Sequence, residues 1–257
     1  MRTVDALRLA PVRFVRGAGL NLAWREWNAG APGVPIVLLH GITGSSADWH
    51  RTASHIEGRR VVALDARGHG QSDWDPAEAY SVDMHFADVA TALDGLEIGR
   101  CIVGGFSMGG AASMLLAACL PERVTALAVI DAYPHPHQTV GSERIARWVS
   151  TSALASRRFD PAIARRFREM LEAGAALRAD LRPIWQAIAC PTLIVRGANS
   201  AVLPRETADE MLQAQPYARL ETIAAIGHAI PEEAPAELAA ILQGFAERTA
   251  GQVSLPH

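Results

Sequence analysis

Ser107 lies within the pattern Gly-Phe-Ser-Met-Gly of residues 105–109, which places its hydroxyl between two glycines. A short apolar run, residues 101–103, precedes the pattern, and a long alanine- and leucine-rich stretch follows it. Strand, sharp turn and helix form the context in which a serine stands above a sheet edge as a nucleophile. Side chains at so tight a turn would collide with the neighbouring strand and helix, which glycine avoids. Taken alone, these five residues also fit a glycine-rich turn that cradles a phosphate.

Composition bounds the kind of protein that carries this serine. With 257 residues, 49% of them hydrophobic, the chain can bury one large core, with room for an inserted subdomain. The net charge of −3 gives no reason to expect nucleic acid or an anionic membrane as a partner. All 24 basic residues are arginine, which excludes lysine-based catalysis.

The sequence also predicts a cytoplasmic location. Arginines interrupt the apolar residues of positions 1–16, so no signal-peptide core is expected there, and no apolar run approaches a membrane span. The three cysteines are an odd number without metal-ligand spacing. We therefore expect reduced core cysteines in a cytoplasmic protein. The partner that we expect is a small-molecule substrate. The sequence does not distinguish a monomer from a homodimer.

The elements that must position Ser107 alternate between strand and helix. A β-hairpin is predicted within residues 7–27, and apolar runs predict strands at 34–39, 60–64, 124–130, 191–195 and 219–223. Helices are predicted from 46 to about 56, from Ser81, after the elbow, from about 205 and at the C-terminus. From 133 to about 185 this alternation stops, although Asp160-Pro161 is a good helix start.

This order predicts an α/β fold with a mostly parallel central sheet of about eight strands and helices on both faces. Residues 1–132 and 187–257 would form the core, and 133–186 a helical cap inserted after the sixth strand. Active sites in such sheets lie beyond the carboxyl ends of the strands.

Four separated motifs together resemble the α/β-hydrolase family. They are His40-Gly41 after the third predicted strand, Asp-x-Arg-Gly-His-Gly-x-Ser at 65–72, the elbow at 105–109, and Gly227-His228. The resemblance runs from about Val12 to Phe245 and leaves only the cap without a family pattern. It implies a serine, acid and histidine triad in that chain order, with no metal or organic cofactor.

A serine hydroxyl needs a general base within hydrogen-bond reach. Among the nine histidines, the resemblance points to His228, in a loop between the last strand and the last helix. We expect Gly227 to let this loop approach the elbow closely; an ordinary loop histidine is the alternative. His40 is expected to hold the oxyanion loop, and Arg67 and His69 to brace the loop after the fourth strand.

The acid departs from the commonest family pattern. Many relatives carry an aspartate in a Gly-x-x-Asp stretch after the seventh strand, but residues 197–200 here read Gly-Ala-Asn-Ser. Asp131 stands at the end of the sixth strand, and neighbouring strand tips lie only about 5 Å apart. We therefore predict Asp131 as the acid, the alternative being that it caps its loop while a serine–histidine dyad acts.

Tetrahedral intermediates need two N–H donors fixed in advance. We expect the backbone of Met108, directly after the nucleophile, and of Ile42, directly after His40-Gly41, to provide them. Phe106, Trp49, Trp148 and Trp185 are candidate lining of the substrate pocket, with core packing as the alternative for each. Cap arginines that pair at i,i+4 spacing with glutamates look like a solvated helix face, and the sequence does not show which others face the pocket.

Three functions fit these residues. The first is a serine hydrolase that cleaves a small to medium carboxylic ester, lactone or amide through an acyl-enzyme on Ser107. The second uses the same triad for carbon–carbon bond hydrolysis or cofactor-free perhydrolysis. The third, from another class, is a ligand-binding or sensor protein that retains the fold with little turnover.

Overall fold

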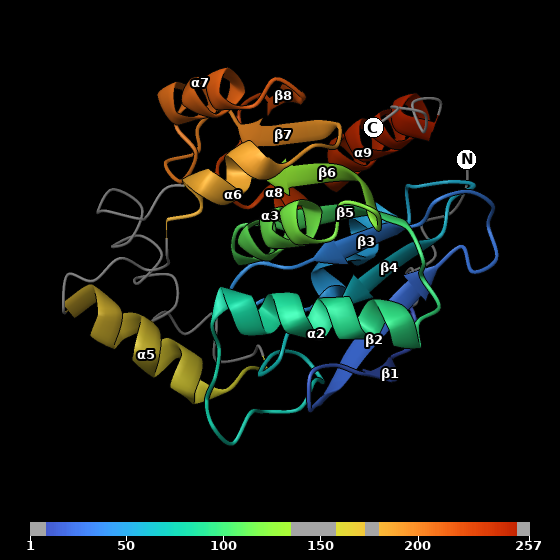
Figure 1. Cartoon of the computed structure of the whole chain (residues 1–257), viewed down its shortest axis with the longest axis vertical. Coiled ribbons are helices and arrows are strands. Elements are labelled where there is room, and N and C mark those ends of the chain that lie inside the picture. Colours follow the sequence, from blue (N-terminus) through green and yellow to red (C-terminus); the bar gives the residue numbers. More distant parts are fainter. Residues whose placement is uncertain (1–8, 135–157, 173–179, 251–257) are drawn as a thin grey trace.

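A computed structural model describes residues 9–134, 158–172 and 180–250 of the chain. The described residues form one eight-stranded sheet in the order β1-β2-β4-β3-β5-β6-β7-β8 (Figure 1). The strands are β1 (Arg13–Arg16), β2 (Asn21–Trp27), β3 (Ile36–Leu39), β4 (Val61–Leu64), β5 (Cys101–Phe106), β6 (Val124–Ile130), β7 (Thr192–Gly197) and β8 (Ala218–Ile223).

Only β2 runs against the rest of the sheet. β1 and β2 form the predicted hairpin, and β2 pairs antiparallel with β4. From β4 onward every pairing is parallel. The predicted fold class is therefore confirmed, and the carboxyl ends of β5, β6 and β7 lie next to one another at one edge of the sheet.

Helices cover both faces of the sheet. On one face α2 (Val82–Gly95), α3 (Met108–Cys119), α6 (Arg182–Ala187) and α7 (Arg205–Ala214) contribute to one apolar cluster. On the other face α1 (His50–Ala53) and α9 (Pro235–Ala250) contribute to a second. The remaining short elements are the 3-10 turn η1 (Ser46–Trp49), α5 (Pro161–Glu172) and α8 (Ile230–Glu233). Each cluster seals one face of the parallel strands from water.

Local sequence explains where several helices begin. The Ser81 hydroxyl accepts a hydrogen bond from the Met84 N–H and so starts α2, as an N-cap serine does. Val89 and Leu93 then face the sheet and are buried. The helix predicted from 46 to about 56 is shorter than expected, because the chain forms a 3-10 turn and then only four α-helical residues.

The predicted cap is described only in part, so the division into core and cap stays a prediction. The α5 helix starts at the expected Asp160-Pro161 step. Just before it, Phe159 forms an isolated bridge with His69, and the Gly70 N–H donates to the Arg158 carbonyl at 2.8 Å. These bonds tie the start of α5 to the loop after β4. In the described ranges, no helix is long and apolar enough to cross a membrane.

Candidate active site

Ser107 occupies the sharp turn between β5 and α3. Its backbone has φ 53° and ψ −113°, a strained conformation for a residue with a side chain that costs on the order of 1–3 kcal/mol. A Cβ added to Gly105 would lie 2.2 Å from the Gly109 carbonyl oxygen, and one added to Gly109 would lie 2.3 Å from that of Leu39. Both glycines are therefore required by space, as the sequence predicted, and the turn holds the serine beyond the end of β5.

Asp131 follows β6 directly and is fully buried. Its N–H donates to the Val195 carbonyl of β7 at 2.7 Å, which fixes the backbone at the tip of the sheet. Its carboxylate accepts three hydrogen bonds: one from the Gly197 N–H at 3.3 Å, one from the Ser200 hydroxyl at 2.5 Å, and one from the His228 ring. A carboxylate held in this way presents a fixed oxygen to the imidazole.

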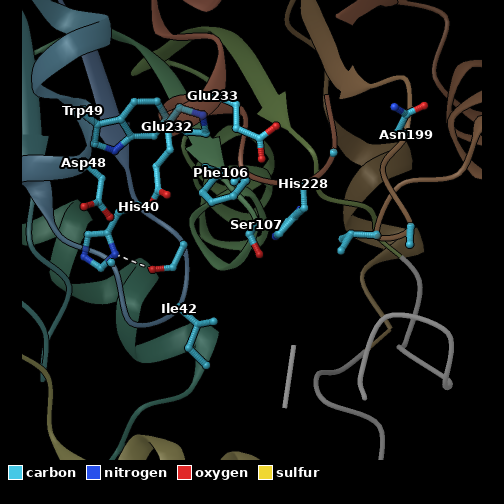
Figure 2. A pocket seen from close by; sticks show the side chains of 17 residues that line it. His40, Ile42, Asp48, Trp49, Phe106, Ser107, Asn199, His228, Glu232 and Glu233 are labelled. Carbon is cyan, nitrogen blue, oxygen red and sulfur yellow. Dashed lines mark hydrogen bonds between the residues drawn. The ribbon is translucent and has the colours of Figure 1, made fainter. Parts of the chain in front are cut away.

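His228 lies in the loop between β8 and α8. Its Nδ1 is 2.6 Å from Asp131 Oδ2, although 97 residues separate the two in the chain. Its ring packs against Phe106, with the ring centroids 4.7 Å apart. Because Nδ1 faces the carboxylate, the other ring nitrogen is left for the cavity that His228 and Ser107 both line (Figure 2).

The close approach expected at Gly227 occurs at another glycine. A Cβ added to Gly227 would meet nothing within 4 Å, so this residue is not required by space. A Cβ added to Gly197, at the end of β7, would lie 2.1 Å from the Gly227 carbonyl oxygen. Gly197 therefore lets the His228 loop pass close to the sheet, and the expectation for Gly227 is corrected accordingly.

The loop after β3 packs directly on the elbow. A Cβ added to Gly41 would lie 2.9 Å from the Phe106 ring and 3.3 Å from Ser107 Cβ. Within the described residues, the backbone N–H groups of Ile42 and Met108 donate no hydrogen bond to another protein group. Donors left unpaired next to a nucleophile are what an oxyanion hole requires.

His40 holds this loop by both ring nitrogens. Its Nε2 accepts from the Ala66 N–H at 2.9 Å, so its Nδ1 carries the hydrogen and donates to the Gly41 carbonyl at 2.7 Å (Figure 2). A neutral imidazole fixed in one tautomer positions the loop rather than carrying protons. The geometry agrees with the role expected for His40.

A cavity of about 330 Å³ opens over Ser107. Phe106 and Trp49, two of the predicted pocket residues, line it together with Ile42 and Val202. Its lining also includes three acidic residues that the sequence did not single out, namely Asp48, Glu232 and Glu233 (Figure 2).

Trp185 does not contribute to this lining. Trp185 is 1% exposed, and its indole N–H donates to the Met211 carbonyl at 3.0 Å. It therefore packs in the core between α6 and α7, and it is not among the described residues around the cavity. The expectation for Trp185 is corrected to core packing. Trp148 lies outside the described residues.

A buried cluster around Arg67 lies beside the loop that follows β3. The sequence predicted that Arg67 and His69 brace the loop after β4. Arg67 is 3% exposed and donates to both carboxylate oxygens of Asp88, at 2.7 and 2.8 Å, and to Asp75 at 2.7 Å. These bonds raise the pKa of Arg67, first of all through Asp88. The two buried contacts with Asp88 hold the loop after β4 against α2, and the partly buried contact with Asp75 holds the loop to itself, in agreement with the predicted role.

Two histidines beside Arg67 have unsatisfied ring nitrogens. His69 Nε2 and both nitrogens of His85 are buried without a hydrogen-bond partner in the described part of the chain. Burial, and secondarily His40, lowers the pKa of His69 well below its usual value, and burial lowers the pKa of His85 to about 3. Both rings are therefore neutral at physiological pH.

Ser200 is the contact that sequence reasoning missed. A hydroxyl carries no charge and cannot replace the acid, but that of Ser200 donates to the same Asp131 oxygen that faces His228. Its oxygen also accepts from the Val202 and Leu203 N–H groups. The available signal was its position, since it stands where the commonest family pattern places the acid.

Comparison with known proteins agrees with the fold. Residues 34–167 match the family model described as alpha/beta hydrolase fold. A 3-hydroxybutyrate-oligomer hydrolase from Cupriavidus necator is 30% identical over 287 residues, which cover 93% of this chain and 97% of that protein. The chain therefore belongs to the α/β-hydrolase fold family.

Other relatives are matched over shorter stretches. An sn-1-specific diacylglycerol lipase from Danio rerio is 36% identical over 118 residues, which cover 45% of this chain and 37% of the lipase. The chain spans less than half the length of several curated relatives that it matches. Among solved structures, a bacterial membrane phospholipase A superposes with a TM-score of 0.79 at 24% identity, over 95% of this chain and 88% of that one, which shows the shared fold.

Proposed function

We propose that this protein is a serine hydrolase that cleaves a small to medium carboxylic ester, lactone or amide through an acyl-enzyme on Ser107. Asp131 and His228 complete the triad. The observation that carries the proposal is the 2.6 Å contact between His228 Nδ1 and Asp131 Oδ2, on a histidine that lines the same cavity as Ser107. A buried carboxylate behind an imidazole that faces a strained serine is the arrangement that activates a hydroxyl.

In the first half of the reaction, Ser107 Oγ attacks the substrate carbonyl carbon while His228 Nε2 takes the hydroxyl proton. The imidazolium that forms is stabilised by the ionised Asp131, which keeps its own charge. Negative charge develops on the carbonyl oxygen, and the N–H groups of Ile42 and Met108 bind it there. When the intermediate collapses, the bond to the leaving group breaks, and His228 gives that group the proton.

In the second half, water attacks the acyl-enzyme. His228 takes one proton from the water, and the same two N–H groups bind the second oxyanion. Collapse breaks the bond from the acyl carbon to Ser107 Oγ, and His228 returns the proton to the serine. The carboxylic acid leaves, and the protein regains its starting state without any other reactant.

The cavity favours a substrate of modest size. Its volume of about 330 Å³ lies at the lower end of the range for small-molecule sites. Ile42, Trp49 and Phe106 give it apolar walls that suit an acyl chain. Two of the relatives reported above are named as a lipase and an oligomer hydrolase, which favours an ester over an amide.

We further propose that residues 133–186 cap this cavity and that the protein is cytoplasmic. The bonds that tie the start of α5 to the loop after β4 support the first proposal. Support for the second comes from the cysteines. All three are free thiols, although Cys119 is exposed and not, as expected, a core residue. Burial raises the pKa of Cys101 and Cys190 to about 12, so neither is poised for disulfide exchange.

Labelling with a fluorophosphonate tests the proposed function. We expect rapid, stoichiometric modification of the full chain that disappears in Ser107→Ala, and faster turnover of p-nitrophenyl esters than of the matching anilides. A well-folded protein that is not labelled would contradict the assignment of Ser107 as the nucleophile. The remaining hypothesis would then be a non-catalytic sensor. Rapid labelling without turnover of esters, lactones or amides would instead point to carbon–carbon bond hydrolysis or perhydrolysis by the same triad.

A further inference from the structure

A second cavity lies on the other side of the loop that follows β3. Its volume is about 240 Å³, and of its lining residues only Gly44 also lines the catalytic cavity. One wall is the loop itself, from Thr43 to Ser46, and the others come from β2, from the loop after β4 and from the segment before α5. The remaining lining residues are Arg25, Asp65, Gly70, Gln71 and Arg158.

Three side chains around this cavity have buried polar atoms without a partner. Within the described residues, no hydrogen bond reaches Arg25 Nε, Thr43 Oγ1 or Ser46 Oγ, and these residues are 8%, 0% and 1% exposed. A buried polar group without a partner destabilises the folded state, so folded proteins rarely leave several together. Their presence around one cavity indicates that a bound group satisfies them.

The charges around the cavity indicate what that group is. Arg25 donates to the Ala10 carbonyl but forms no ion pair with a carboxylate of the described residues. Burial lowers the pKa of Arg25, and the nearby Asp65 offsets this only in part. The charge of this guanidinium is thus poorly compensated, which favours an anionic ligand.

Asp65 does not supply the missing partner. Its two oxygens accept from the Ser46 N–H at 2.5 Å and the Gln71 N–H at 2.8 Å. With Arg25 and the exposed Arg158 as cations and Asp65 as the only lining anion, the described walls carry one net positive charge. A monoanion balances that charge, whereas a phosphate dianion would be repelled by Asp65.

We propose that this cavity binds a small carboxylate monoanion, held by the Arg25 guanidinium and by the Thr43 and Ser46 hydroxyls. A planar carboxylate offers two oxygens, which suits a guanidinium on one side and hydroxyl donors on the other. Since a water occupies about 30 Å³ in the liquid, the cavity accommodates an acid of a few heavy atoms with some water.

Occupancy of this cavity would also act on the catalytic loop. Thr43 follows Ile42 directly and has a φ of 62°, in the left-handed region that a β-branched residue rarely adopts. A ligand bound to the Thr43 hydroxyl would hold this backbone and, with it, the neighbouring N–H of Ile42. This consequence rests on the proposed function, but the binding itself does not.

Calorimetry with sodium acetate on full-length Ser107→Ala protein tests the binding without turnover. We expect one saturable site whose affinity falls about tenfold or more in Arg25→Gln, because a charge-assisted hydrogen bond is lost. The double variant Thr43→Val, Ser46→Ala should weaken acetate several-fold while folding normally, because neither hydroxyl has a protein partner. Arg16→Gln removes an exposed arginine from the neighbouring strand and should leave the affinity unchanged.

Inorganic phosphate at pH 8 serves as the second probe, and we expect it to bind at least about tenfold more weakly than acetate, since it is a dianion there. Absence of saturable acetate binding, or equal affinity in the double variant and its parent, would overturn the proposal. Tighter binding of phosphate would overturn the carboxylate assignment. If Arg25→Gln fails to fold, the affinity of the double variant for acetate still tests the proposal. Because the test measures binding, it also holds if the protein cleaves no ester.

Discussion

Two sets of histidines among the described residues differ in their surroundings, the first being His228 and the second the buried pair His69 and His85. His228 has a carboxylate 2.6 Å from Nδ1 and faces the open cavity over Ser107. His69 and His85 are buried without any carboxylate bond, and His85 has no hydrogen-bond partner among the described residues. Asp88, which follows His85 by three residues on α2, is engaged on both oxygens by Arg67.

This difference shows how a protein assigns roles to the same side chain. A partnered imidazole can take a proton because Asp131 stabilises the cation that forms. An unpartnered imidazole next to Arg67 cannot, because burial and the neighbouring charge keep it neutral. We therefore expect substitutions in the first set to affect turnover, and substitutions in the second to affect stability and its dependence on pH.

The largest effect is expected at the base itself. His228→Gln should lower kcat for a p-nitrophenyl ester by about 10⁵-fold, because the serine loses the group that takes its proton. His55→Gln, on an exposed histidine outside the site, is the matched control and should turn over normally. Steady-state kinetics with circular dichroism of both variants is the measurement. A decrease in kcat of less than tenfold in a folded His228→Gln protein would show that His228 is not the general base.

Asp131→Asn should lower kcat by about 10³- to 10⁴-fold with the fold intact. The amide fills the same space but carries no charge to stabilise an imidazolium on His228. The near-ultraviolet circular dichroism spectrum should match that of the parent, since the amide keeps the shape of the carboxylate and its oxygen can still accept from the Gly197 N–H. A variant that retains most of its activity would favour the serine–histidine dyad.

His85→Leu tests the neutral set through the pH dependence of stability. The folded protein keeps His85 neutral down to about pH 3, whereas the unfolded chain binds a proton near pH 6.5. Above pH 6.5 this histidine therefore does not lower the free energy of unfolding. As the pH falls from 6.5 towards 3, the free energy of unfolding decreases by about 1.4 kcal/mol per pH unit for each such histidine.

Removing this histidine should make the free energy of unfolding fall less steeply between pH 6 and pH 4, and should leave kcat at pH 8 within about twofold, because only packing changes. Urea unfolding at several pH values provides the measurement. His55→Gln, on an exposed histidine outside this cluster, again serves as the control. An unchanged slope in His85→Leu would show that His85 is protonated in the folded protein.

The smallest effect is expected at Ser200. Ser200→Ala removes one of three hydrogen bonds to the Asp131 carboxylate, and the Gly197 and His228 bonds remain. We expect kcat to fall by less than about tenfold and stability by about 1 kcal/mol, since the Val202 and Leu203 N–H groups also lose an acceptor. A larger loss of activity in Ser200→Ala than in Asp131→Asn would overturn the assignment of the acid.

Two of the proposed catalytic residues could be placed from the sequence, Ser107 by a short-range signal and Asp131 by the order of the strands. The elbow needs glycines within two residues of Ser107, and the added-Cβ distances show why. Asp131 was predictable from strand order, since its own strand ends beside β7 and its N–H donates to Val195 of that strand. Parallel pairing brings the ends of consecutive strands together, so a residue one strand away reaches the same imidazole.

Other features had no local signal. Trp185 looked like pocket lining by residue type, but its position under α7 buries it in the core. Gly197 rather than Gly227 makes the close contact, because the Gly227 carbonyl is the group that points at the sheet. The polar cavity around Arg25 joins segments from four parts of the chain, and no spacing in the sequence relates them.

By itself, then, the sequence determined the order of strands and helices, the strained serine, and the identities of the acid and base to be tested. These depend on backbone sterics and on alternation along the chain, which neighbouring residues dictate. Only the tertiary structure decided which histidine receives a carboxylate, which hydroxyl holds that carboxylate, and which polar atoms remain unpaired. Such contacts join residues far apart in the chain, and their distances follow from the packing of whole elements.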